Sequence, residues 1–477
     1  MQILFVASEV GPWSKTGGLG DVAGALPQAL AERGNEVAVV TPRHGSIDPH
    51  AAGLQPVRTA LHVRGEPVAL WVKRGPAPVY FVEHPHLFGS RRGLYGEGGR
   101  DHGDNAERFA FLTRAALALP AALGLRPRIL HLNDWQCGLG PWLLRHEHAR
   151  DPALAGARTV FTIHNLAYQG LFPKQVLPAL GLPWEVFRWE AMEFFDQLSF
   201  MKAGLAFADA LTTVSPTYAR EILTPEGGAS LDALLRHRAR DLHGILNGID
   251  VHAWDPARDP HLPAHFGAGD LTGKAACKAA LQREVGLPVR PEVPVAGLVT
   301  RLAEQKGIDL VAAALPALLA RDVQVVLLGS GDAAYEQAFA RAAREHPDRV
   351  AARIGFDEGL AHRIEAGADL FLMPSRFEPC GLNQMYSLRY GTVPVVRAVG
   401  GLADTVEDFD GFARGTGFRF SEYTPQALLT ATRRALDVFR DRRAWRGLVE
   451  RGMAEDNSWE RSAARYEALY RTLAPGR

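Results

Sequence analysis

The sequence has no long apolar run, very few cysteines and no excess of charge of either sign. Because no stretch of about 18 apolar residues occurs, no membrane-spanning segment is expected. The 53 basic and 53 acidic residues give a formal net charge of +0, which argues against a nucleic acid or an anionic membrane as partner. The three cysteines have no metal-like spacing, and the chain enters an apolar segment at Met1–Val6 without a basic leader. These absences predict a cytoplasmic protein in a reducing compartment.

Lysine is scarce as well, since only seven of the 53 basic residues are lysine. Two of the seven, Lys15 and Lys306, lie in glycine-containing motifs. A general preference for arginine explains the composition but not these two positions. Both lysines are therefore candidates for binding an anion.

Short apolar runs separated by helical patterns recur along the whole chain, as expected for strands buried on both faces of parallel sheets. A chain of 477 residues is too long for a single core. We therefore expect two doubly wound α/β domains, 1–247 and 248–455, that face one another across a cleft, and a C-terminal helix in 456–477 that crosses back to the first domain. The apolar runs lie at 3–8, 37–41, 79–83, 128–132, 159–163, 210–214, 295–300, 323–328, 350–354, 369–373 and 393–396.

The stretch "WSKTGGLGDV" (13–22) follows the first apolar run. Its glycines leave backbone N–H groups accessible to an anion, and the residues from Asp21 onward have helical spacing. Lys15, Gly17 and Gly18 would therefore lie at a helix N-terminus, where phosphate binds well. The pattern is neither GxGxxG nor GxxxxGK[ST], so it is not a dinucleotide or P-loop motif. A plain strand-to-helix turn with a solvated lysine remains the alternative.

Two stretches of the second domain carry charged residues at expected strand ends. "VTRLAEQKGIDLV" places Arg301 and Lys306 there, where two cations can bind a diphosphate. "SRFEPCGL" places Glu378 before a turn into a helix, a suitable position for binding sugar hydroxyls. Solvated surface charges are the alternative in both cases.

Three stretches of the first domain end in polar residues that could line the same site. His164 ends one expected strand, Asp134 follows another, and Asn247 lies near the domain boundary. A buried histidine is more often a satisfied core group than a ligand, so His164 alone decides nothing. "DFD" (408–410) matches a metal-binding signature of another class of glycosyltransferases, but in this glycine-flanked position we interpret it as a surface turn.

Nine stretches occur in one order along almost the whole chain, and that series resembles the family of bacterial glycogen synthases and plant starch synthases. The resemblance implies a GT-B fold of two Rossmann-like domains. It also implies retaining transfer of glucose from ADP-glucose to the non-reducing end of an α-1,4-glucan such as glycogen, without a metal or a separate cofactor. The stretches are "KTGGLGDV", "DNAERF", "NLAYQG", "TTVSPTYAREI", "ILNGID", "GKAACK", "RLAEQKGIDL", "SRFEPCGL" and "GGLADTV".

The resemblance also assigns roles to individual residues. The first domain would hold the acceptor and the second the nucleotide sugar. Lys15 with Gly17 and Gly18 would contact phosphate and the reacting sugar, and Arg301 and Lys306 would neutralise the departing diphosphate.

The remaining assignments concern the sugar, the base and the acceptor. His164 and Asn247 would hold the glucose near its 6-hydroxyl, and Glu378 would hold its 3-hydroxyl. Phe356 replaces a tyrosine that lies beside the base in some members and can still stack on it. Other expected substrate contacts, from the same motifs and from the acceptor side, are Asp21, Tyr95, Asp134, Cys380, Gly381 and Leu382.

The sequence departs from the family pattern at Gln136, where a histidine is usual, and at Asn383, where a threonine is usual. We expect both changes to alter affinity without abolishing activity. Because no second carboxylate is evident for a covalent intermediate, we expect front-face transfer, in which a diphosphate oxygen takes the acceptor's proton. Two alternatives remain: a UDP-sugar transferase or epimerase, and a non-catalytic protein that binds glucan or nucleotide on the same scaffold.

Overall fold

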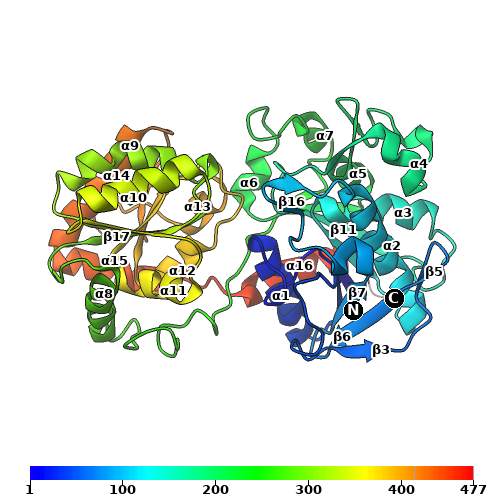
Figure 1. The fold of residues 1–477 in the computed structure, drawn as a ribbon, viewed down its shortest axis with the longest axis horizontal. Helices are drawn as coiled ribbons and strands as arrows, with labels where there is room; N and C mark the ends of the chain where they lie inside the picture. The colour runs from blue at the N-terminus through cyan, green and yellow to red at the C-terminus, as the bar shows by residue number, and fades with distance from the viewer. Residues whose placement is uncertain (413, 476–477) are drawn as a thin grey trace. The chain divides into compact units, whose positions relative to one another are not determined.

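The computed structural model describes residues 1–412 and 414–475 and forms two compact units (Figure 1). The first unit comprises Met1–Gly248 together with the segment that begins at Trp459, and the second is Ile249–Ser458. These limits lie beside the boundaries expected from the sequence, after residues 247 and 455. The last helix therefore belongs to the first unit.

The first unit is built on a sheet that is parallel in its centre and antiparallel at one edge. Central strands such as β1 are apolar after their first residue and bury both faces, as the sequence pattern predicts. In the described residues, the strand order is β16 (Leu242–Gly244), β15 (Ala210–Thr213), β11 (Arg158–Ile163), β10 (Ile129–Asn133), β1 (Gln2–Val6), β2 (Glu36–Pro42), β7 (Val79–Glu83), β6 (Ala69–Lys73) and β3 (Gln55–Val57).

Helices cover both faces of this sheet (Figure 1). On one face, Ile3 and Phe5 of β1 pack into a core formed with α1 (Gly18–Glu32) and α16 (Trp459–Leu473). On the other face, α5 (Phe200–Phe207) lies so close to β11 that a Cβ at Gly204 would be 2.4 Å from the Phe161 ring. The further helices of this unit are α2 (Asn105–Leu123), α3 (Gly140–His146), α4 (Leu177–Leu180), α6 (Pro216–Glu221) and α7 (Asp232–His237).

Helix α16 is bound to the first unit by polar contacts as well as by its apolar face. The Tyr470 hydroxyl lies 2.6 Å from Nδ1 of His131 on β10, and both side chains are buried. Glu467 accepts a hydrogen bond from Arg33 at 2.9 Å, immediately after α1 ends. The segment from Trp459 onward thus completes the core over α1.

The second unit contains a fully parallel sheet with the strand order of a doubly wound Rossmann fold. Numbered by their appearance along the chain, its strands lie in the order 3-2-1-4-5-6. In the described residues these are β19 (Val350–Ile354), β18 (Gln324–Gly329), β17 (Val295–Val299), β20 (Leu370–Met373), β21 (Val393–Arg397) and β22 (Phe418–Phe420).

Helices α9, α10 and α14 pack on one face of the second sheet, and α8 and α11 pack on the other (Figure 1). The alternation is visible in β17, where Ala296 and Leu298 contribute to the first core and Val295 to the second. The helices of this unit are α8 (Thr272–Val285), α9 (Ile308–Leu319), α10 (Ala333–Glu345), α11 (Glu358–Gly367), α12 (Asn383–Arg389), α13 (Gly400–Thr405), α14 (Pro425–Arg440) and α15 (Arg442–Met453).

The segment that interrupts the strand and helix rhythm after residue 248 packs onto the second unit. Trp254 lies between the rings of His362 and Tyr386, with centroid distances of 3.7 and 3.8 Å. Asp259 is buried and accepts hydrogen bonds from His362 at 2.7 Å and from the Tyr390 hydroxyl at 2.6 Å. These contacts assign the segment to the second unit.

All eleven apolar runs form strands. The sequence did not reveal the antiparallel edge strands β6 and β3, or the short strands β16 and β22. Small hairpins were also missed: β4 (His62–Val63) with β5 (Glu66–Pro67), β8 (Gly96–Glu97) with β9 (Arg100–Asp101), and β12 (Leu171–Pro173) with β13 (Glu193–Phe194) and β14 (Gln197–Ser199).

The "DFD" segment is a structured turn. Asp408 accepts a hydrogen bond from the Arg419 backbone at 2.7 Å and pairs with Arg434, while Phe409 is buried in the core. Its middle residue is therefore not on the surface, contrary to the expectation of a simple surface turn. Within the described parts of the chain, no helix combines the length and apolar character that a bilayer crossing requires.

Candidate active site

The order of the strands predicts where each unit binds a ligand. In doubly wound sheets, ligands bind at the carboxyl ends of the strands where the strand order reverses. That reversal falls between β1 and β10 in the first unit and between β17 and β20 in the second. The loops after these four strands carry the candidates Lys15, Asp134, Arg301, Lys306 and Glu378.

The loop after β1 leads directly into α1, as the sequence predicts. Gly17 is the residue before the helix, and Lys15 Nζ lies 2.6 Å from Asp21 Oδ1 in its first turn. The Lys15 side chain is 49% exposed, so it remains accessible to a ligand. A Cβ at Gly17 or at Gly18 would meet no atom within 4 Å. Packing within the unit therefore does not require these two glycines, which is consistent with close approach of a ligand.

Glu9 lies beneath this loop and was not identified from the sequence. It is 3% exposed and accepts hydrogen bonds from the Thr16 backbone N–H, from the Thr16 hydroxyl at 3.0 Å and from the Tyr95 hydroxyl at 2.8 Å. Burial raises the pKa of Glu9, although these hydrogen bonds oppose the effect. A carboxylate three residues after the apolar run Ile3–Val6 was the available sequence signal.

Asp134 has a strained backbone at the end of β10. Its φ of +56° and ψ of −178° fall in a region that glycine almost alone adopts. One carboxylate oxygen accepts hydrogen bonds from the backbone N–H groups of His164 at 2.7 Å and Asn165 at 3.4 Å. Burial raises the pKa of Asp134 to about 7, and the charge of Glu9 adds to this. Backbone strain at a buried aspartate that follows a strand end indicates a functional constraint.

His164 is a neutral hydrogen-bonding group in this arrangement. Burial lowers its pKa to about 3. Its Nε2 lies 2.9 Å from Oδ1 of Asn133, whose amide nitrogen donates to the Val6 carbonyl. Because Asn133 presents its oxygen, Nε2 of His164 carries the proton. Nδ1 of His164 is then an acceptor, suited to a hydroxyl group.

Asn247 and Gln136 each have a buried side-chain oxygen without a hydrogen-bond partner among the described residues. Such oxygens are rare in folded proteins and call for an explanation. For Asn247, a hydroxyl of bound sugar would supply the missing partner. Gln136 takes the position of the family's usual histidine, and its side chain is buried.

In the second unit, Glu378 and Lys306 form an ion pair. Lys306 Nζ lies 2.7 Å from Glu378 Oε2, and the Ser375 hydroxyl donates to the same oxygen at 2.9 Å. The Glu378 side chain is 6% exposed, so the carboxylate is enclosed and charged groups hold its position. Ser375 was not among the residues predicted from the sequence.

The loop that carries Glu378 lies directly against two glycines of "GGLADTV". A Cβ at Gly400 would be 1.9 Å from the Glu378 carbonyl oxygen, and one at Gly401 would be 2.1 Å from that of Cys380. The Gly401 N–H also donates to the Glu378 carbonyl at 3.2 Å. The two glycines are thus required for the conformation of this loop.

The turn after Glu378 is fixed by a single glutamine. Gly381 has a φ of +74°, and Gln384 donates to the carbonyl oxygens of Cys380 at 3.1 Å and Gly381 at 3.0 Å. Leu382 precedes α12, which begins at Asn383. Cys380 is buried, in agreement with a packing role.

Three other expected ligand contacts differ in how their side chains are placed. Arg301 is exposed and donates to Gln305 at 3.2 Å. Phe356 follows β19 and is 88% exposed, so its ring is free to stack on a base. The Asn383 amide donates to the Val299 carbonyl at 2.9 Å, so this group already binds the end of β17.

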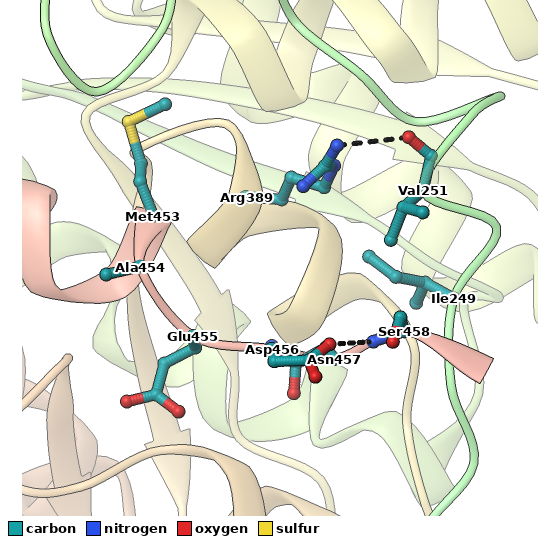
Figure 2. Close-up of a pocket in the computed structure, with 9 residues that line it drawn as sticks. All are labelled: Ile249, Val251, Arg389, Met453, Ala454, Glu455, Asp456, Asn457 and Ser458. Atoms are coloured by element: carbon teal, nitrogen blue, oxygen red, sulfur yellow. Dashed lines mark hydrogen bonds between the residues drawn. The ribbon is translucent and has the colours of Figure 1, made fainter. Parts of the chain in front are cut away.

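A cavity of about 310 Å³ lies elsewhere in the second unit (Figure 2). Ile249 and Val251 line one side, and residues 453–458 line another. Arg389 donates to the Val251 carbonyl at 3.0 Å across it, as Figure 2 shows. None of the predicted site residues lines this cavity, so it is separate from the strand-end candidates.

The comparisons with known proteins decide the family. A model described as the starch synthase catalytic domain matches residues 2–237, and one described as glycosyl transferases group 1 matches 285–446. A glycogen synthase of Anaeromyxobacter dehalogenans is 96% identical, and the match covers 100% of both chains. The chain belongs to the family of glycogen and starch synthases.

More distant members of the glycogen and starch synthase family match over almost the same length. A glycogen synthase of Myxococcus xanthus is 53% identical over 99% of both chains. The catalytic domain of starch synthase IV from Arabidopsis thaliana, solved bound to ADP and acarbose, is 35% identical with a TM-score of 0.91 over 99% of both chains. These findings confirm the predicted GT-B fold and assign the chain to the glycosyltransferases.

Proposed function

We propose that the chain transfers glucose from ADP-glucose to the non-reducing end of an α-1,4-glucan with retention of configuration at C1. The observation that carries this proposal is the set of paired cations and carboxylates at the two strand-order reversals. Lys306 pairs with Glu378 and Lys15 pairs with Asp21, and the family resemblance assigns Lys15, Lys306 and Glu378 to the donor. The ADP and acarbose bound to the Arabidopsis domain support a nucleotide and a glucan as ligands.

We assign the donor's diphosphate to Lys15, Arg301 and Lys306. Cleavage of the C1–O bond leaves negative charge on the diphosphate and oxocarbenium character on the sugar. Preorganised cations stabilise the first charge most effectively where water is excluded. The Glu378 carboxylate would stabilise the positive charge on the sugar while it accepts a hydrogen bond from a sugar hydroxyl.

We assign the sugar's other hydroxyls to the first unit. Nδ1 of His164 is an acceptor, and the buried side-chain oxygen of Asn247 has no hydrogen-bond partner among the described residues. In the same unit, the Tyr95 hydroxyl donates a hydrogen bond to Glu9. Tyr95 therefore contributes to the site through its ring and through Glu9, because its hydroxyl is already bound.

We also propose front-face transfer as the mechanism. Both carboxylate oxygens of Glu9 accept hydrogen bonds from Thr16, so this group is not placed as a nucleophile. One oxygen of Asp134 is bound to backbone N–H groups. A diphosphate oxygen that accepts the proton of the incoming glucan hydroxyl then serves as the base.

The cytoplasmic location remains a prediction from the cysteine content.

The decisive experiment compares ADP-glucose with UDP-glucose as donors, with glycogen as acceptor and radiolabelled glucose incorporation as the readout. We expect a higher kcat/KM with ADP-glucose and release of the label by an α-1,4-specific glucanase. A higher kcat/KM with UDP-glucose would support the alternative donor. Binding of glycogen without incorporation from either donor would support the non-catalytic alternative.

Activity should not depend on a divalent metal. Lys15, Arg301 and Lys306 supply the positive charge that a metal would otherwise place beside the diphosphate. The measurement is the transfer rate with excess EDTA, with and without added Mg²⁺ or Mn²⁺. Complete loss in EDTA with recovery on metal addition would contradict this assignment.

Substitution of Lys15 by alanine should mainly impair use of the donor. Loss of one charge-assisted hydrogen bond costs about 1.5–3 kcal/mol, which corresponds to a fall in kcat/KM of roughly 10- to 150-fold. Lys15→Arg should recover only part of this, because a planar guanidinium does not replace a point charge. Lys73→Ala, on strand β6 between β7 and β3, is the matched control. If kcat/KM for the donor were unchanged in Lys15→Ala, Lys15 would be a solvated surface residue with no role in binding the donor.

Activity should rise as the pH increases through about 7, the pKa of Asp134. Below that pH the carboxyl is protonated and neutral, and above it the negative charge can stabilise the positively charged sugar. Asp134→Asn should abolish this rise. His164 does not contribute, because its pKa of about 3 keeps it neutral across the range. A rise with the same midpoint in Asp134→Asn would assign the titration to another group.

A further inference from the structure

Glu9 is a buried carboxylate for which the family resemblance assigned no role. It follows β1 and is almost fully enclosed, in the loop that leads to Lys15 and α1. A buried charge is costly unless it is fully hydrogen-bonded. The hydrogen bonds of the Glu9 carboxylate therefore identify the residues that it holds in place.

The main contact of Glu9 is with Thr16, the residue between Lys15 and Gly17. The Thr16 backbone N–H donates to Oε2, and its hydroxyl lies 3.0 Å from Oε1 and 3.2 Å from Oε2. The carboxylate thus binds both the main chain and the side chain of one residue. Such a contact fixes the backbone direction at Thr16 as well as its position.

Glu9 is itself held from the opposite side by Tyr95. The Tyr95 hydroxyl donates to Oε1 of Glu9 at 2.8 Å and lies 2.7 Å from the Ser8 hydroxyl. Since Tyr95 donates its only proton to Glu9, the Ser8 hydroxyl donates to Tyr95. This chain of hydrogen bonds connects the Thr16 backbone to an aromatic side chain from a segment far along the sequence.

Besides this anchor, the segment from Lys15 to Gly18 is held by the ion pair of Lys15 with Asp21 and by α1, which begins at Gly18. Lys15 is half exposed, and the two glycines have open space where a side chain would be. Conformational freedom in such a segment is large, because glycine restricts the backbone least. The anchor at Thr16 therefore fixes the backbone from which the Lys15 side chain and the Gly17 N–H extend.

We propose that Glu9 is a positioning residue that holds the Lys15–Gly18 segment in the geometry that binds the donor. The proposal rests on the proposed function for the donor contact of Lys15. Because the segment is already ordered, the donor does not have to order it on binding. Loss of the anchor therefore lowers kcat/KM for the donor without removing any group that touches the donor.

The first test measures the loop without any substrate. Hydrogen exchange of the peptide that contains residues 12–22 is compared between the wild type, Glu9→Gln and Glu185→Gln, an exposed glutamate of the same unit. Glutamine places an amide donor where one carboxylate oxygen accepted, so we expect at least about tenfold faster exchange in this peptide for Glu9→Gln alone. Unchanged exchange would overturn the proposal. This result does not depend on whether the protein uses ADP-glucose.

The second test separates positioning from a general loss of stability. Glu9→Gln should lower kcat/KM for ADP-glucose by about ten- to a hundredfold in the wild type. In a Lys15→Ala background the same change should cost less than about threefold, because the group that it positions is gone. Equal losses in both backgrounds would overturn the proposal. If the wild type transferred no glucose, the proposed function would be contradicted. The hydrogen-exchange experiment alone would then test the role of Glu9.

Thr16 provides an independent set of variants if Glu9→Gln fails to fold. Thr16→Ser keeps the hydroxyl and should retain at least about half of the wild-type kcat/KM. Thr16→Val keeps the shape but removes the hydroxyl that donates to Glu9, and it should show the same dependence on Lys15 as Glu9→Gln. Identical kinetics for Thr16→Val and the wild type would overturn the proposal.

Discussion

Replacement of Glu378 by glutamine should lower kcat by about two to three orders of magnitude, equivalent to roughly 3–4 kcal/mol of transition-state stabilisation. Glutamine retains an oxygen that can accept from Lys306 and Ser375, so the loop should keep its conformation. The negative charge beside the sugar is lost, and that charge matters only when the sugar becomes positive. Because ground-state glucose is neutral, the KM for the donor should change little.

The measurement for Glu378→Gln is kcat and the thermal midpoint on the same preparation. Glu345→Gln, an exposed glutamate at the end of α10, is the matched control. A kcat close to that of the wild type would remove Glu378 from the reaction. A large fall of the thermal midpoint would show that the Lys306 pair holds the loop and that Glu378 has a structural role.

Substitution of Lys306 by alanine should lower kcat/KM for the donor by about three orders of magnitude, more than substitution of Lys15. Lys306 neutralises the enclosed Glu378 and is also assigned to the diphosphate, so its loss affects both groups. Loss of one preorganised stabilising group costs roughly 10²–10³ in rate, and an unpaired buried charge adds to this. The thermal midpoint should also fall by a few degrees, since the pair is largely enclosed.

A double-mutant cycle checks the dual role of Lys306. The loss caused by Lys306→Ala should be clearly smaller in the Glu378→Gln background, because no unpaired carboxylate then remains. Lys306→Arg should recover part of the activity, as arginine keeps the charge but not the compact shape. Independent, additive losses would show that the contact in the structure has no energetic consequence.

The strand-end positions of the candidate residues could be predicted from the sequence because the central strands are apolar on both faces. In β1 or β17 no polar residue interrupts the run, so the first polar residues after it mark the carboxyl end of the strand. The edge strands could not be predicted in this way. β6 alternates between exposed and buried residues, and its pairing with β7 is antiparallel.

Hydrogen bonds between distant segments were not predictable from local patterns. The contact of Lys306 with Glu378 joins residues 72 positions apart, and that of Tyr95 with Glu9 joins residues 86 positions apart. The motifs indicated which residues matter, but spacing along the chain does not show that one carboxylate holds the loop of another motif. The strained backbone of Asp134 had no sequence signal either, since glycine would normally be expected there.

The first unit is completed by a segment that is synthesised after the whole of the second unit. Tyr470 and Glu467 of α16 supply the partners of His131 and Arg33, whereas the second unit is one continuous segment that precedes them. On the ribosome, the part of α1 that packs against α16 therefore stays uncovered until the second unit has been synthesised, so that unit can already be folded. A premature stop codon shortly before Trp459 would thus damage the amino-terminal unit and leave the carboxyl-terminal one intact.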